Sequence, residues 1–419
     1  MSKLRPTSIQ TQHLRFADLA KEWTPDFGEG SLSKYLVKHG IDHLFELEDT
    51  DGVRNRLLDL HFFKELYGDI DWTEILKYWR TLGEEEDAGE FYLKAADKAL
   101  SREVDESLLD AITAVSEFCF YAYWMDKGLE ITKKNLESKE RLLGAEHPDT
   151  LNSVNTMGVI LSDMGNYEEA EKFYRRALEG REQVLGAEHP DTLTSVCNMG
   201  VLLSDMGNYE EAEKFYRRAL EGRTKILGET HEKTLDTTYF LASVLEDMKR
   251  YEEAEEYYRK ELEGLEKTVG MEDSNTLISV NGMGVLLRNM GNYEEAENYF
   301  RRALEGRTKV LGETHEDTLF TAYCLASVLN HMERYVEAEK VCRKALDIRS
   351  QLEEPDYGDI GNTQLLLAEI LANTDQEKEA LKMAKAAKKS YKITEEEELV
   401  GKADELIKEI QSSVESKKT

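Results

Sequence analysis

The sequence contains few residues that break helices or cross-link chains. Its 419 residues include only 5 prolines, and because proline ends or kinks a helix, this scarcity allows long uninterrupted helices. The four cysteines show no C-x-x-C spacing, which is typical of buried thiols in a reducing compartment and predicts a cytoplasmic protein. They are Cys119, Cys197, Cys324 and Cys342.

Long apolar runs are also missing from the sequence. No segment approaches the roughly 20 apolar residues that a membrane-spanning helix requires. The N-terminal stretch MSKLRPTSIQTQHLRF has no apolar centre of the kind found in a secretory signal. We therefore expect neither membrane association nor secretion.

Basic side chains are scarce relative to acidic ones. The sequence has 54 lysines and arginines against 85 aspartates and glutamates, which gives a formal net charge of -31. Such a surface repels the phosphate backbone, so we expect no nucleic-acid binding. It favours basic or neutral protein partners through an attraction that salt screens.

Motifs for catalysis and metal binding are absent as well. No phosphate-binding GxxxxGK[ST], no nucleophile elbow and no HExxH occurs. His39 and His43 lie on one predicted helix face without a nearby cluster of further ligands, which favours packing over metal binding. We expect no enzyme activity, no metal and no cofactor. Four further histidines recur once per repeat, too far apart to share an ion, and are interpreted as helix caps or linker residues: His147, His189, His231 and His315.

The feature that the sequence has in abundance is self-similarity. The segment LSDMGNYEEAEKFYRRALEGR occurs at 161–181 and again, unchanged, at 203–223, and residues 151–192 and 193–234 agree at 31 of 42 positions. Apolar residues recur at steps of three and four, which predicts two amphipathic helices per 42-residue unit. Small residues in fixed columns, such as Gly158 and Ala170, allow the two helices to approach closely.

The linkers between units carry the signals of helix ends. Gly186 is suited to a left-handed conformation after one helix, and Pro190 to the first turn of the next. Asp191 or Thr192 is the predicted cap for the free amides of that turn. Because such a helix pair cannot bury its apolar stripe alone, the pairs are expected to stack into a solenoid.

This pattern resembles the tetratricopeptide repeat, through Gly158, Tyr167, Ala170, Tyr174 and Ala177. The 42-residue length is similar to the repeats of kinesin light chains, nephrocystin and many STAND NTPases. The resemblance implies an all-α fold, a right-handed α-solenoid of about seven helix pairs. We expect a helical N-terminal module at 1–104, the repeats at 105–392, and a capping helix with its tail at 393–419.

Residues 32–66 carry a second resemblance. Their Y-x-x-x-H helix and the following LLD-x-x-F segment are similar to the region that follows the winged-helix module of STAND NTPases. Since no phosphate-binding loop is present, the NTPase itself is absent. The segment is either the C-terminal part of a longer receptor or a module that is used alone.

The tetratricopeptide resemblance also implies a binding face. The first helix of each pair is expected to line the concave groove, where asparagines grip an extended peptide backbone. One end of this groove is acidic and the other neutral to basic, which predicts a partner with a basic segment and departs from the basic groove of kinesin light chains. The predicted groove residues are Asn152, Asn155, Asp163, Asn198, Asp205, Tyr239, Glu246, Asp247, Asn281, Arg288, Asn289, Tyr323, Asn330 and His331.

Three functions remain open for a scaffold that binds a protein or peptide without catalysis. It is the ligand-sensing domain of a STAND-type receptor, which residues 32–66 favour, or a free-standing adaptor that bridges partners, or a regulatory subunit that docks on an enzyme. The sequence indicates neither the ligand nor the oligomeric state.

Overall fold

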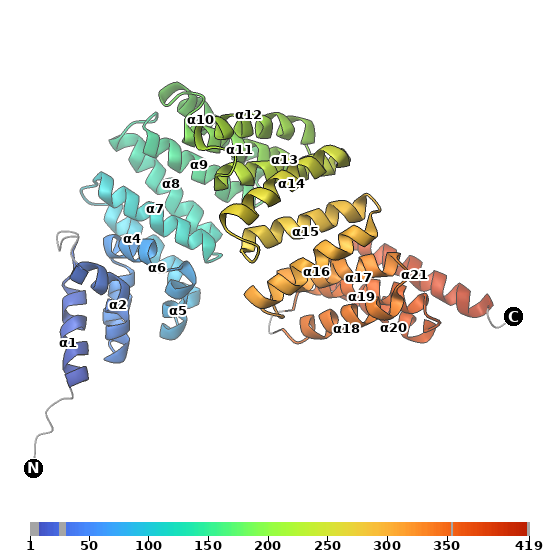
Figure 1. Ribbon diagram of the computed structural model, residues 1–419. Coiled ribbons are helices and arrows are strands. Elements are labelled where there is room, and N and C mark those ends of the chain that lie inside the picture. The colour runs from blue at the N-terminus through green and yellow to red at the C-terminus, as the bar shows by residue number, and fades with distance from the viewer. Residues whose placement is uncertain (1–7, 25–30, 353–354, 417–419) are drawn as a thin grey trace, which may run out of the picture. The chain divides into compact units, whose positions relative to one another are not determined.

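The computed structural model describes residues 8–24, 31–352 and 355–416, and all regular structure in these ranges is helical (Figure 1). The described residues form 21 α-helices and no strand, which confirms the predicted all-α fold. None of the helices found there is both long and apolar enough to span a bilayer. The chain divides into two compact units, Met1–Phe215 and Tyr216–Thr419, and the division falls within one helix.

Six helices precede the repeats. Three of the short ones begin at aspartate caps, because Asp49, Asp59 and Asp71 each accept a hydrogen bond from a backbone N–H of the first turn. The helices are α1 (Ser8–Lys21), α2 (Ser31–Glu46), α3 (Thr50–Leu57), α4 (Leu60–Asp69), α5 (Trp72–Leu82) and α6 (Glu85–Leu100).

An aromatic core joins these helices to the first repeat. The rings of Phe63, Tyr92 and Phe118 meet edge to face, with centroids 5.0 to 5.7 Å apart. Phe118 belongs to α7 (Glu106–Tyr121), which packs on α4. One hydrophobic core therefore runs across the position between residues 104 and 105.

Seven consecutive helix pairs follow, as the repeat length predicts. Neighbouring helices pack in order from α7 to α11 in the first unit and from α13 to α20 in the second, and α21 (Glu397–Ser416) packs against the last pair. After α7 these helices are α8 (Met125–Leu142), α9 (Pro148–Asp163), α10 (Tyr167–Val184), α11 (Pro190–Asp205), α12 (Tyr209–Leu227), α13 (Glu232–Asp247), α14 (Tyr251–Thr268), α15 (Ser274–Asn289), α16 (Tyr293–Val310), α17 (Glu316–His331), α18 (Tyr335–Arg349), α19 (Tyr357–Ala372) and α20 (Glu377–Ile393).

The repeat positions that hold small residues lie where two helices approach closely. A Cβ added to Gly158 would lie 2.7 Å from the ring of Tyr174, and one added to Gly284 would lie 2.8 Å from the ring of Phe300. Both distances are shorter than van der Waals contact. Glycine at this column therefore lets the large aromatic residue of the second helix lie directly on the first helix.

The helix ends follow the predicted glycine and proline signals, but the cap is a different residue. Gly186 is left-handed, with φ of 93°, and Pro190 occupies the first turn, as expected. The predicted caps Asp191 and Thr192 are wrong, because the helix begins at Pro190 and the preceding His189 therefore occupies the capping position. Its Nδ1 accepts a hydrogen bond from the amide of Asp191 at 3.2 Å.

The other linker histidines act in the same way, which confirms their interpretation as caps. Nδ1 of His147, His231 and His315 accepts a hydrogen bond from the amide two residues later, at 3.2 to 3.3 Å. In the linker between α14 and α15, which has no histidine, Asp273 caps α15 by accepting a hydrogen bond from the amide of Asn275.

Candidate functional site

The predicted binding residues of the first unit lie on α9 and α11 and are partly joined to one another. Asn155 is buried, and its Oδ1 accepts hydrogen bonds from Asn198 Nδ2 at 3.2 Å and from Ser195 Oγ at 3.4 Å. Oδ1 of Asn152 accepts a hydrogen bond from the guanidinium of Arg181. Asn155 therefore links α9 to α11, whereas Asn152 links α9 to α10 within the same helix pair.

Asp163 and Asp205 present exposed carboxylates at the last residues of α9 and α11. The surrounding helices displace water, and this burial raises the pKa of both groups. The negative charge of Asp163 raises the pKa of Asp205 further. Among the described residues, no ion pair neutralises either group.

In the second unit, Asp247 is the last residue of α13, so this first helix also ends in an aspartate. Its carboxylate is exposed, and partial burial raises its pKa. The adjacent Glu246 is engaged within the protein. Its Oε1 accepts a hydrogen bond from Asn289 Nδ2 at 2.8 Å and its Oε2 accepts one from the hydroxyl of Tyr258 at 3.3 Å.

The charge changes beyond α13. Asn289 and His331 end α15 and α17, at the position where the three preceding first helices end in aspartate. Arg288 donates to Oδ1 of Asn289 at 3.4 Å, and its Nη1 lies 3.9 Å from the sulfur of Cys324. Nδ1 of His331 lies 2.8 Å from the carbonyl oxygen of Ser327.

Three further predicted residues lie deeper in the second unit. Asn281 is buried, and its Oδ1 accepts a hydrogen bond from the hydroxyl of Thr321 at 3.1 Å. Tyr323 is half-buried, and burial raises the pKa of its hydroxyl. The Oδ1 of Asn330 is buried and has no hydrogen-bond partner in the described part of the chain.

A row of buried arginines was missed by the sequence reasoning. Arg181 and Arg307 are each only 4% exposed, near the ends of α10 and α16. Nη1 of Arg181 donates to the carbonyl oxygen of Asp191 at 3.0 Å and to Ser195 Oγ at 2.6 Å. The signal in the sequence was the arginine that ends the repeated segment ALEGR, which recurs as Arg181, Arg223 and Arg307.

The same arrangement recurs in the second unit. Nη1 of Arg223 donates to the carbonyl oxygen of Lys233 and to Thr237 Oγ1, at 2.9 and 2.6 Å. Nη1 of Arg307 donates to the carbonyl oxygen of Asp317 and to Thr321 Oγ1, at 2.9 and 2.8 Å. Each guanidinium thus ties a second helix to the next first helix through neutral oxygen acceptors.

The repeat of α13 and α14 breaks this pattern at two positions. Leu265 stands in the arginine column, and Glu261 stands in a column that is otherwise alanine in the repeats from α10 to α20. Glu261 is only 3% exposed. Its Oε1 accepts a hydrogen bond from Ser279 Oγ at 2.5 Å, while its Oε2 has no hydrogen-bond partner.

Burial dominates the electrostatics of Glu261. It raises the pKa of this carboxyl to about 7, helped by the charge of Asp236 and opposed by the hydrogen bond from Ser279. The residue lines a cavity of about 190 Å³ between α13, α14 and α15. The full lining is Asp236, Tyr239, Phe240, Glu261, Asn275, Ile278 and Ser279, and it includes one predicted site residue, Tyr239.

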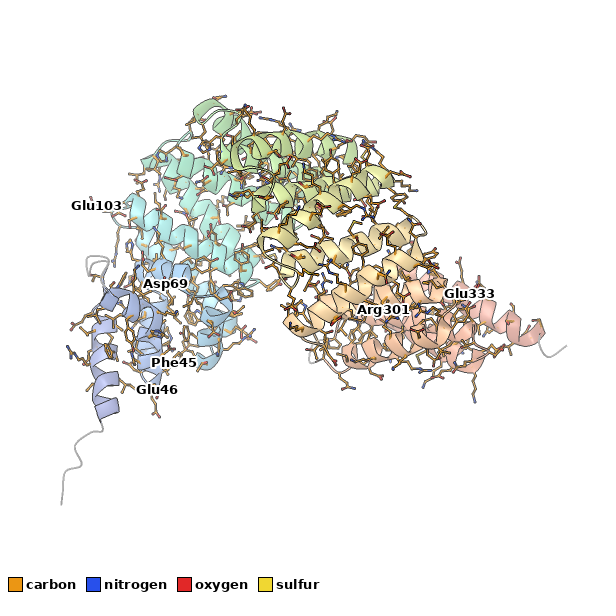
Figure 2. All side chains as sticks on the ribbon, viewed as in Figure 1. Phe45, Glu46, Asp69, Glu103, Arg301 and Glu333 are labelled. Atoms are coloured by element: carbon orange, nitrogen blue, oxygen red, sulfur yellow. The ribbon has the colours of Figure 1, made fainter. Side chains whose placement is uncertain are left out.

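A second cavity, of about 320 Å³, lies between α16, α17 and α18. Arg301, labelled on α16 in Figure 2, lines it together with Leu304 and Ala345. It is present because Val341 occupies a column that holds phenylalanine or tyrosine in the four preceding repeats. Apolar side chains make up much of its wall, and its charged lining residues include the ion pairs Arg301–Glu337 and Lys344–Glu313.

The histidine pair of the N-terminal module packs against an aromatic ring, as the sequence predicts. The rings of His39 and His43 lie 4.9 and 5.7 Å from the ring of Tyr35. Across the ranges that the structure describes, no cluster of three or more histidine, cysteine, aspartate or glutamate side chains could hold a metal ion.

Several solved structures are similar to this chain. The apo form of the quorum sensor NprR from B. thuringiensis is 15% identical with a TM-score of 0.51, and the match covers 81% of this chain and 96% of that one. A Rap protein complexed with competence and sporulation factor is 14% identical with a TM-score of 0.49, covering 82% and 97%. A putative kinesin light chain from Podosopora anserina, with nearly identical TPR-like repeats, is 20% identical with a TM-score of 0.45, covering 50% and 99%.

The family comparison addresses the sequence directly. Models of the tetratricopeptide repeat match residues 125–183, 152–225, 191–267 and 317–393, and a related model of the same repeat matches 276–317. No curated protein matches the sequence. The family matches begin after residues 32–66 and do not extend to the predicted STAND-like segment. Because they cover more than half of the sequence, the chain belongs to the tetratricopeptide repeat family and is a helical-repeat scaffold.

Proposed function

We propose that the chain is a non-catalytic scaffold that binds a basic segment of a partner protein on the exposed face of its first helices. The observation that carries this proposal is a carboxylate that recurs at the same repeat position, as Asp163 and Asp205 in the first unit and Asp247 in the second. Each one ends a first helix, is exposed, and has a pKa raised by partial burial.

The position of these carboxylates makes them electrostatically unsatisfied. The C-terminus of a helix carries partial negative charge, so an aspartate there is less stable than a basic residue. Partial loss of hydration adds to the cost of the ionised form. A lysine or arginine of a partner would relieve both effects, and it would determine the direction in which the partner lies along the repeats.

Apolar groups on the same face support contact with an extended chain. Ile278 and Phe320 lie at equivalent positions of α15 and α17 and are 38% and 42% exposed. A peptide in extended conformation presents alternate side chains to such a surface. In this proposal Asn155 and Asn281 form the floor of the site, and the carboxylates and exposed apolar groups contact the partner.

The experiment is affinity capture from source-cell lysate with partner identification by mass spectrometry, followed by binding of a synthetic peptide that spans the partner's basic segment. The variant reverses three charges: Asp163→Lys, Asp205→Lys and Asp247→Lys. The matched control reverses Glu179, Glu221 and Glu305, which are exposed on second helices. We expect at least a tenfold loss of peptide affinity in the first variant and less than a twofold change in the control.

Unchanged affinity in the folded aspartate variant would overturn the proposal. Equal losses in both variants would also overturn it, because they would show a dependence on net charge alone.

A ligand-sensing role in a STAND-type receptor is the candidate that the N-terminal module favours. Residues 32–66 lie in α2, α3 and α4, and their core continues into α7 and α8 of the first repeat. A ligand that reorders the repeats would therefore act on the module directly. NprR, which shares the fold, is itself a sensor by its description. A free-standing adaptor or a regulatory subunit would use the same binding face.

The mass of the endogenous protein separates these roles. An antibody against the repeats would isolate it from source cells, and intact mass spectrometry would show whether an NTPase belongs to the same polypeptide. An additional NTPase domain supports the sensor role, and its absence supports the adaptor or the regulatory subunit.

A further inference from the structure

The cavity beside Glu261 lies among residues whose counterparts bind an arginine in another repeat. Arg181 is held by Asn152 Oδ1, the carbonyl oxygen of Asp191 and Ser195 Oγ. The residues 84 positions later are Asp236, Asn275 and Ser279, and all three line the cavity. The counterpart of the arginine is Leu265, which brings no guanidinium to them.

Two positions around the cavity hold an acidic residue where the corresponding position of another repeat is neutral. A neutral amide oxygen at Asn152 becomes a carboxylate at Asp236, and the alanine column acquires the carboxyl group of Glu261. Neighbouring repeats therefore enclose a cation among neutral acceptors. This repeat instead has two acidic groups there, the buried Glu261 and the exposed Asp236, and no cation of its own in the arginine column.

The residue with the unpartnered oxygen, Glu261, is one of those that line the cavity. Glu261 is 3% exposed and its Oε2 has no hydrogen-bond partner. Buried polar atoms in proteins nearly always have a partner, so an unpaired carboxyl oxygen in a residue that lines a cavity points to a donor from outside the chain. Ser279 already donates to Oε1, which leaves Oε2 as the free acceptor.

The rest of the wall favours a planar cation. Tyr239 and Phe240 contribute aromatic rings, and Ile278 contributes an apolar side chain that is partly exposed to solvent. A guanidinium can stack on an aromatic ring while its N–H groups donate to carboxylates, and its aliphatic stem can lie on apolar surface. An ammonium group lacks the planar fork and loses more hydration when it is buried.

We propose that the cavity between α13, α14 and α15 binds an arginine side chain of the partner, which supplies the guanidinium that Leu265 lacks. This inference rests on the proposed function, and it names one residue that the partner's basic segment must contain. Asp236 and Glu261 bind the N–H groups, and Tyr239 and Phe240 flank the plane.

The test is calorimetric titration at pH 8 and 150 mM salt with the probe peptide acetyl-Gly-Arg-Gly-amide and its lysine and citrulline analogues. Non-specific attraction to an acidic protein affects the arginine and lysine peptides alike, so the difference between their affinities measures binding in the cavity. Leu265→Arg fills the cavity from within the chain. Thr268→Arg is the matched control, because it adds the same charge to an exposed position of the same helix.

We expect wild type and Thr268→Arg to bind the arginine peptide at least tenfold more tightly than the lysine or citrulline peptide. Leu265→Arg, and independently Glu261→Ala, should weaken the arginine peptide at least tenfold while circular dichroism shows a folded helical protein. Equal binding of the arginine and lysine peptides to wild type would overturn the inference. So would unchanged arginine-peptide binding in a folded Leu265→Arg or Glu261→Ala protein.

Partner capture separates this inference from the proposed function. If Leu265→Arg retains the partner's basic segment at full affinity and the three aspartate reversals lose it, the cavity proposal fails and the proposed function stands. If the aspartate reversals retain the segment while Leu265→Arg abolishes arginine-peptide binding, the proposed function fails and the cavity remains an arginine site.

Discussion

The repeat that contains Arg181 and the repeat that contains Leu265 have the same helix pattern and opposite buried charges. In the first, a cation lies among neutral oxygen acceptors of the next helix. In the second, a buried carboxyl has one hydrogen-bond donor and one free oxygen. Because the repeats are so similar, the difference cannot come from a change of fold. One repeat therefore lacks the arginine that links its second helix to the next first helix, and it has a cavity beside a buried carboxyl group instead.

The largest expected effect comes from breaking the arginine tie. Arg181→Leu should lower the free energy of unfolding by roughly 3 kcal/mol, because hydrogen bonds from a charged donor to buried acceptors contribute about 1.5–3 kcal/mol each and the acceptors stay buried. The urea midpoint of unfolding measures the loss. Arg175→Leu is the control, since Arg175 is exposed and forms a surface ion pair with Glu171. Equal midpoints for the two variants would contradict the structural role of Arg181.

The pH dependence of stability tests the role of Glu261 in this comparison. Its pKa is raised to about 7 in the folded protein, so the folded state retains a proton that the unfolded chain releases above its ordinary value of 4.5. Stability from this group is therefore greatest below pH 4.5 and is lost as the pH rises to about 7. The loss is about 3 kcal/mol for a shift of this size.

Glu261→Gln isolates this contribution from the other carboxylates whose pKa values are raised. Urea unfolding of wild type and variant at pH 5, 6, 7 and 8 gives the difference in free energy at each pH. We expect wild type to lose stability relative to Glu261→Gln across this range. Parallel curves would show that Glu261 ionises normally.

The converse substitution should make the two repeats alike. Leu265→Arg places a guanidinium near Asp236, Glu261 and the carbonyl oxygen of Asn275, so we expect a gain in stability of about 1–2 kcal/mol. Thermal unfolding detects it as a raised Tm, and Thr268→Arg controls for the added charge. A lowered Tm for Leu265→Arg alone would mean that this repeat does not accommodate the arginine.

The smallest effect concerns the caps. His189→Ala should destabilise the protein by about 1 kcal/mol, which is the usual cost of losing a side-chain cap. His189→Asp should restore most of the loss, because Asp273 caps α15 in the same way. Thermal unfolding of the three proteins compares them. A rescue that fails would show that the imidazole contributes packing that a carboxylate cannot replace.

The sequence by itself determined the helical period, the seven pairs and the helix ends. These features follow from local rules: apolar spacing selects the helix, glycine permits the left-handed residue of Gly186, and proline starts the helix at Pro190. Repetition strengthened each signal because the same residue type recurred at the same place. Even here, the choice of His189 over Asp191 as the cap depended on the residue at which the helix begins.

Only the tertiary structure decided which polar side chains are buried and what they contact. The sequence predicted Asn155 and Asn281 as groove residues. In the structure both are buried, and their amide oxygens accept hydrogen bonds from the adjacent first helices. Arg181 drew no prediction from the sequence, yet it is enclosed between α10 and α11. The sequence also showed Glu261 as one acidic residue among 85. Its meaning arises from partners on α13 and α15, because burial and hydrogen bonding between helices are set by packing over distances that no local pattern encodes.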